Sequence, residues 1–148
     1  GQPAYQIIQK QLENHPQFVV EKANLILSSL ARGIKEANVP TYLFSLFRPS
    51  IQSYLISWFK YDPAEEIKKL NFPTLILHGN TDIQVTIEQG RSLSKASNNA
   101  SFVVIDGMNH ILKTASIDNK QNLETYHDPR IELHPQLIIE IVNFLKRY

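Results

Sequence analysis

Two short apolar runs, separated by one helical pattern, constrain this chain more than any other feature of its sequence. Residues 74–78 read TLILH and residues 101–106 read SFVVID, and neither run alternates between apolar and polar residues. Runs of this kind are typical of strands that are covered on both faces of a parallel sheet. Thr86 and Gln89 predict a capping box for a helix that ends near residue 97. A strand, a helix and a strand in this order predict a right-handed parallel unit, so the expected fold class is α/β.

Residues 1–61 are predicted to be a helical segment, because they carry helical periodicity and no convincing strand pattern. One helix is expected over residues 4–15, and a second from Pro16 to about Gly33, where glycine favours a helix stop. The apolar residues predicted to share a helical face are Tyr5, Ile8 and Leu12 in the first helix and Phe18, Leu25, Ile26 and Leu30 in the second.

Residues 39–61 are rich in large apolar and aromatic side chains, and Pro40 and Pro49 divide this stretch into two short predicted helices. Its aromatic residues are Tyr42, Phe44, Phe47, Tyr54, Trp58, Phe59 and Tyr61. Two interpretations remain open for them. They close the core of the helical segment, which is the commoner arrangement, or some of them line an apolar pocket or lid.

Residues 62–148 alternate between helices and strands, with Asp62 as the predicted N-cap of the first helix. Residues 107–133 form a long and mostly polar loop with one helical turn expected near residues 122–126. Pro135 is expected to begin the last helix. The apolar stripe predicted for that helix consists of Leu137, Ile138, Ile141, Val142 and Leu145.

Two titratable residues follow the two predicted strands, and they form the candidate catalytic pair. Asp82 lies in HGNTDIQV after the first strand, and His110 lies 28 residues later in IDGMNHIL after the second. The carboxyl ends of adjacent parallel strands meet at one edge of a sheet, so the two loops are expected to lie within hydrogen-bonding reach. A carboxylate that accepts the Nδ1 proton of an imidazole leaves Nε2 to act as a general base. Gly79 and Gly107 permit the sharp turns that this placement requires.

The same motifs resemble the final third of an α/β-hydrolase of the serine esterase and serine aminopeptidase-like branch. The family acid lies in a G-x-x-D element, which corresponds to Gly79–Asp82, and the family histidine corresponds to His110 in GMNH. Residues 1–61 then correspond to a helical lid or cap, and residues 62–148 to the C-terminal β-α-β-α part of the hydrolase core. The resemblance is good over residues 41–113 and in the last helix, and weak over residues 1–40.

The resemblance implies a serine hydrolase that cleaves carboxylic esters through an acyl-enzyme, without a cofactor or metal. The family nucleophile sits in a G-x-S-x-G elbow, and no two glycines of this chain are four positions apart. We therefore expect this chain to be the C-terminal portion of a longer enzyme whose N-terminal half supplies the serine and the oxyanion hole. The chain alone is expected to be inactive. An amidase or aminopeptidase with the same triad remains an alternative to the esterase.

A third interpretation belongs to a different class of protein. The chain is then a non-catalytic module that uses the hydrolase-like half-fold for binding or assembly. An unpaired strand edge tends to pair with another chain, so we expect a homo-oligomer that forms through the edge of residues 74–78 or through exposed lid helices.

Composition excludes several other functions. A net charge of +1 and the absence of a basic-aromatic stripe argue against a nucleic-acid partner, and no apolar run approaches the length of a membrane span. The chain is expected to be soluble; its compartment is not indicated, because any export signal would precede it. Without cysteine, thiolate catalysis and Cys-ligated zinc are excluded. His127, Glu132 and His134 lack the spacing of metal ligands. Lys113 is expected to be solvated surface.

Overall fold

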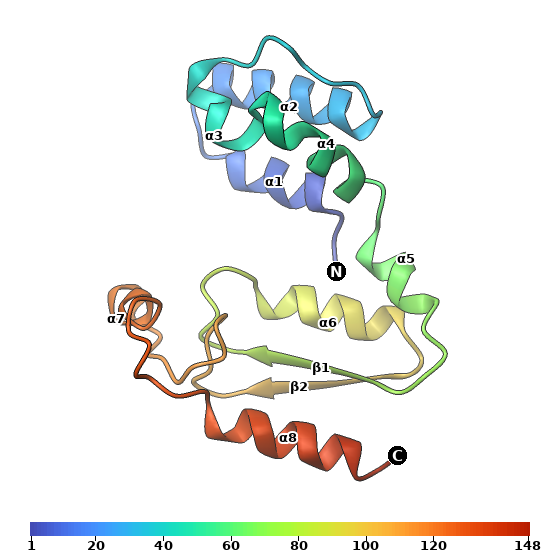
Figure 1. The fold of residues 1–148 in the computed structure, drawn as a ribbon, viewed down its shortest axis with the longest axis vertical. Coiled ribbons are helices and arrows are strands. Elements are labelled where there is room, and N and C mark those ends of the chain that lie inside the picture. Colours follow the sequence, from blue (N-terminus) through green and yellow to red (C-terminus); the bar gives the residue numbers. More distant parts are fainter. The chain divides into compact units, whose positions relative to one another are not determined.

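The computed structural model describes residues 1–148, which form two compact units. One unit comprises Gln2–Glu66, and the other comprises Ile67–Tyr148 together with Gly1. The first is entirely helical, and the second contains a two-stranded parallel sheet with helices (Figure 1). The fold is therefore mixed α/β. The division falls within α5 (Pro63–Lys68), a few residues after the position at which the sequence suggests one.

Proline and glycine determine where the helices of the first unit begin and end. Its elements are α1 (Ala4–Leu12), α2 (Gln17–Ala31), the 3₁₀ turn η1 (Thr41–Leu43), α3 (Phe44–Phe47) and α4 (Pro49–Trp58). Pro16 immediately precedes α2, and Pro49 is the first residue of α4, where its missing N–H costs no helical hydrogen bond. Gly33, at φ +81°, ends α2 as predicted. Its N–H donates to Leu30 O and the N–H of Ile34 donates to Ser29 O, which is the Schellman pattern.

The core of the helical unit is built around one stripe of α2. The buried residues of the unit are Ala4, Leu12, Val19, Ala23, Ile26, Leu27, Leu30, Leu43, Phe47, Leu55 and Phe59, and Tyr5 and Ile8 pack against them. The predicted face of α1 is thus confirmed. In α2, the prediction is wrong for Phe18 and Leu25, which are 61% and 65% exposed. Both lie one residue, or about 100° of helical rotation, from the buried stripe.

The aromatic residues of this unit are mostly on its surface. Phe47 and Phe59 are buried, but the other five that were expected to close a core or line a pocket are exposed. These five are Tyr42, Phe44, Tyr54, Trp58 and Tyr61. The core interpretation is therefore right for two residues and wrong for five. Some of the exposed rings contact another ring: Phe18 meets Tyr42 edge-on with centroids 5.6 Å apart, and Tyr54 lies 5.7 Å from Trp58.

The second unit is a parallel β-α-β arrangement with a helix on each face of the sheet. After α5 come β1 (Thr74–Gly79), α6 (Ile87–Ala96), β2 (Ala100–Ile105), α7 (Asn119–Glu124) and α8 (Pro135–Leu145). The strands pair in parallel, with Thr74 opposite Ala100 and Gly79 opposite Ile105. Helix α6 covers one face of the sheet and α8 covers the other (Figure 1). The predicted crossover is therefore present.

The small sheet limits how much of α8 becomes buried. Ile105, Met108 and Leu137 form the buried cluster of this unit, with Leu77, Val103 and Ile141 packed against it. The remaining members of the predicted stripe, Ile138, Val142 and Leu145, are exposed. A sheet of two strands is only about 5 Å wide between strand axes, so it covers one row of the helix instead of the whole stripe.

Two local details complete the fold. The predicted capping box of α6 is wrong, because Thr86 occupies the N-cap position without a side-chain capping bond to the first turn. Asp62 does cap α5, since its Oδ1 accepts the N–H of Ala64 at 2.8 Å.

None of the helices combines the length and the apolar character that crossing a lipid bilayer requires.

Candidate active site

Asp82 and His110 lie together at the carboxyl ends of β1 and β2. Asp82 follows β1 by three residues and His110 follows β2 by five, and the parallel pairing of the strands ends with Gly79 opposite Ile105. The Nδ1 atom of His110 lies 2.9 Å from Oδ2 of Asp82. A carboxylate carries no proton to donate at neutral pH, so Nδ1–H is the donor and Oδ2 is the acceptor. The contact that the strand spacing predicts is therefore present.

The Asp82 carboxylate is held by the backbone of its own loop. Its second oxygen, Oδ1, accepts hydrogen bonds from the N–H of Gln84 at 2.8 Å and the N–H of Val85 at 2.9 Å. The side chain of Asp82 is only 7% exposed, whereas that of His110 is 41% exposed. Two backbone donors and one imidazole donor thus fix both oxygens of a buried carboxylate, and the imidazole keeps its other edge toward solvent.

Gly79 brings the two loops into direct contact. A Cβ at this position would overlap the carbonyl of Met108, so only glycine allows the backbones to approach this closely. The Met108 carbonyl accepts the N–H of Thr81 at 3.2 Å, and the side chain of Asn80 accepts the N–H of Gly107 at 2.7 Å. Gly107 has φ +73°, which favours glycine for a conformational reason instead of a steric one.

His110 lies on a tight turn between Asn109 and Lys113. The Asn109 N–H donates to Lys113 O at 3.0 Å, and the Lys113 N–H donates to the side-chain oxygen of Asn109 at 3.1 Å. Leu112, inside the turn, has φ +64°, a conformation that costs a non-glycine residue about 1–2 kcal/mol. The carbonyl of Leu112 accepts the N–H of His134 at 2.7 Å, which ties the turn to the start of α8.

The pair borders a shallow hollow of about 190 Å³. Its lining residues are Leu77, His78, Gly79, Asp82, Val85, Met108, Asn109, His110 and Leu112. None of these side chains carries a hydroxyl or thiol, so the hollow contains an oriented imidazole without an alcohol or thiol beside it. Leu77, Val85, Met108 and Leu112 supply an apolar wall next to the imidazole.

His78 is a neighbour of the pair rather than part of it. Its Nε2 lies 3.0 Å from the carbonyl of Val85 and 4.0 Å from Oδ2 of Asp82. The shorter contact assigns the Nε2 proton to the carbonyl, so the ring spans the base of the Asp82 loop. His78 is thus a buried, hydrogen-bonded residue beside the site.

Sequence reasoning missed a buried polar network behind the pair. Asn109, Asn122 and Thr125 are all buried, and the Asn109 amide donates to the side chains of the other two. Lys113, expected to be solvated, donates from Nζ to the carbonyls of Thr125 at 3.3 Å and Asp128 at 2.7 Å. That expectation is wrong because the loop folds back and its carbonyls need a donor. The one available signal was the presence of two asparagines and a threonine in a loop too long to lie on the surface unsupported.

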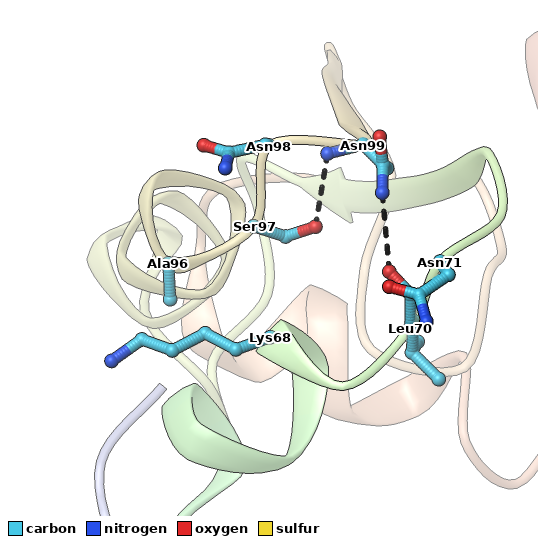
Figure 2. Close-up of a pocket in the computed structure, with 7 residues that line it drawn as sticks. All are labelled: Lys68, Leu70, Asn71, Ala96, Ser97, Asn98 and Asn99. Atoms are coloured by element: carbon cyan, nitrogen blue, oxygen red, sulfur yellow. Dashed lines mark hydrogen bonds between the residues drawn. The ribbon is translucent and has the colours of Figure 1, made fainter.

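The other polar groups of the unit form no comparable site. No three His, Asp or Glu side chains gather as metal ligands do, and His134 instead caps α8 through Nδ1. A second hollow of about 410 Å³ lies where the strands begin, and Figure 2 shows the Asn99 amide pointing to the Leu70 carbonyl across it. Its polar side chains are three asparagines, Ser97 and Lys68, so it lacks both an imidazole and a carboxylate.

Comparisons with protein-family models, with curated proteins and with solved structures returned no match for this chain.

Proposed function

We propose that this chain carries the acid and the histidine of a serine-hydrolase triad that cleaves carboxylic esters. The observation that carries the proposal is the 2.9 Å contact between His110 Nδ1 and Asp82 Oδ2 at the carboxyl ends of two parallel strands. The buried carboxylate is held on its other oxygen by two backbone N–H groups. Such an acid selects the imidazole tautomer that a general base needs. The resemblance of GNTD and GMNH to the motifs of the α/β-hydrolases supports the same function.

In this proposal, Nε2 of His110 takes the proton of a serine hydroxyl that another polypeptide segment supplies. The serine oxygen attacks the ester carbonyl, and the same proton then passes from Nε2 to the departing alkoxide, which leaves an acyl-enzyme. In the second half of the reaction, Nε2 takes a proton from water, the water oxygen attacks the acyl-enzyme, and the proton passes to the serine oxygen as the carboxylic acid product leaves. The apolar wall beside the imidazole suits an uncharged acyl or alcohol group. Amide substrates use the same groups, and the expected amidase or aminopeptidase is the alternative within this class.

The chain alone tests one half of the proposal. It should hydrolyse an unactivated alkyl ester such as ethyl acetate, which an imidazole alone does not cleave, no faster than its His110→Ala variant, because a base without a serine and an oxyanion hole supplies little of the rate enhancement. Turnover by the chain that disappears in His110→Ala would contradict the assignment of the serine to another segment.

The coding sequence upstream of Gly1 tests the other half. A G-x-S-x-G element after a strand pattern supports the hydrolase. In a protein that joins this element to the chain, Asp82→Ala or His110→Ala should lower kcat for short acyl esters on the order of 10⁴-fold. Rates close to normal in both variants would eliminate the triad assignment.

A second function, as a non-catalytic assembly module, is favoured by a different observation. Each strand of the sheet has a neighbour on one side only, so both strands leave an edge unpaired, and α8 exposes Ile138 and Val142. In that function the chain self-associates through a strand edge or through its exposed helices. Light scattering coupled to size exclusion should then report a dimer or larger species. A monomer at high concentration would argue strongly against it.

A further inference from the structure

We propose that Asn122 is a positioning residue, which holds the Asp82 loop and the His110 turn in one register through a buried amide network. The inference rests on the proposed function, because it concerns how the acid and the histidine are kept together. Asn122 lies in α7, outside both motifs, and its side-chain hydrogen bonds go to Asn109, Thr81 and Ser116 rather than to Asp82 or His110. It acts through the residue that precedes each of them in the chain.

The first connection runs from Asn122 to the acid loop. Asn122 is fully buried, and its Nδ2 donates to the carbonyl of Thr81 at 2.7 Å and to the carbonyl of Ser116 at 2.9 Å. The Thr81 carbonyl belongs to the peptide that leads into Asp82. An amide with two donor hydrogens satisfies both carbonyls, and no hydroxyl or carboxylate side chain of similar size can do so.

The second connection runs from Asn122 to the histidine turn. Its Oδ1 accepts from Nδ2 of Asn109 at 3.2 Å, and Asn109 immediately precedes His110. The same Nδ2 donates to Thr125 Oγ1 at 2.7 Å, and the Thr125 hydroxyl donates to the Asn122 carbonyl at 2.7 Å. Asn109 in turn closes the turn around His110 by accepting the N–H of Lys113. Its amide is only 1% exposed, so water cannot replace these bonds.

The amides of Asn109 and Asn122 and the hydroxyl of Thr125 are therefore all paired within this network. Buried polar networks are stable only when all their members are satisfied, so removing one amide loosens the others. Loss of Asn122 leaves the buried carbonyl of Thr81 and the partly buried carbonyl of Ser116 without the donor that Asn122 provides. We infer that the Asp82 loop then moves relative to the His110 turn, and that the Nδ1–Oδ2 hydrogen bond weakens.

The tautomer of His110 reports on this hydrogen bond without any enzymatic activity. Long-range ¹H–¹⁵N NMR at a pH at which the imidazole is neutral distinguishes Nδ1–H from Nε2–H. In the unsubstituted chain, Nδ1–H should predominate, and Asp82→Asn should remove that preference. If Asp82→Asn changes nothing, the proposed function fails at this step, before Asn122 is considered.

Asn122→Ala should lower the ratio of Nδ1–H to Nε2–H about tenfold, which corresponds to about 1.4 kcal/mol. In an Asp82→Asn background, the same substitution should add no further change, because the bond that it affects is already absent. A ratio in Asn122→Ala equal to that of the unsubstituted chain would overturn the proposal while leaving the proposed function intact.

Two further variants separate positioning from general stability. Thr125→Val keeps the shape of the side chain and removes one hydroxyl, so it should shift the ratio in the same direction, and it decides the question if Asn122→Ala does not fold. Gln52→Ala is the matched control. Gln52 is as buried as Asn109 and also makes three side-chain hydrogen bonds, but it lies in the helical unit. It should lower stability and leave the His110 tautomer unchanged; a shift in this control equal to that in Asn122→Ala would assign the effect to stability alone.

Discussion

Substitution of Gly79 by alanine tests the close approach of the two loops most directly. The added Cβ would overlap the Met108 carbonyl, and it would also lie 3.0 Å from the Met108 Cβ. The backbone after β2 must therefore retreat, and the hydrogen bond from Thr81 N–H to Met108 O is lost. Overpacking of a filled site costs about 1–3 kcal/mol, and a lost backbone hydrogen bond adds about 1 kcal/mol. We expect Gly79→Ala to destabilise the sheet unit by about 2–4 kcal/mol in total.

This loss should lower the midpoint of thermal unfolding of the sheet unit by at least about 8 °C, from the scaling for domains of its size. Amide hydrogen exchange in β1 and β2 measures the unit that carries the substitution, independently of the helical unit. Gly107→Ala is the matched control. It meets no atom within 4 Å, so only the strain of φ +73° applies, at about 1–2 kcal/mol. Equal effects of the two substitutions, or a Gly79→Ala chain as stable as the unsubstituted one, would refute the steric reasoning.

Three further outcomes follow from the packing and charges of the two units. Gln52→Ala should destabilise the helical unit by about 1–3 kcal/mol, since the backbone groups of Glu36 and Phe47 lose their partner; faster amide exchange in α2 and α4 would show it. Leu137→Ala should cost about 2–5 kcal/mol and the exposed Leu145→Ala less than about 0.5 kcal/mol, as measured by denaturant unfolding. The pKa of Glu88 is held below its ordinary value of 4.5, first by a hydrogen bond from the backbone N–H of Glu88 itself and then by one from the Thr86 hydroxyl. Glu88 thus contributes stability above pH 4.5 that is lost as the pH falls through its lowered folded value, and Glu88→Gln should flatten that part of the acid unfolding curve.

Asp82 and His110 were predictable because their proximity depends on topology alone. Two continuous apolar runs with a helix between them permit one parallel pairing, and the loops after parallel strands meet at the same edge. The contact needed only a spacing of 28 residues and two residue types that hydrogen-bond to each other. The fold class was predictable for the same reason.

The amide network was not predictable, because its members are distant in the chain and ordinary in type. Asn122 reaches a carbonyl 41 residues away, and nothing near it in the sequence distinguishes it from a surface asparagine. Polar residues in a long loop are typical of solvent exposure. Only the folding of the loop over the end of the sheet makes Asn109 and Asn122 buried.

Local sequence signals were sufficient to predict several helix boundaries and the parallel pairing of β1 and β2. Pro16, Pro49 and Gly33 act on their own backbone dihedrals, so no other part of the fold can change their effect. The buried faces of α2 and α8, in contrast, depended on the elements that pack against them. The apolar residues of α2 and α8 form stripes wider than the surfaces that cover them. Phe18 is exposed because the helices around α2 cover a neighbouring row of side chains. Leu145 is exposed because a sheet of two strands can cover only one row of α8.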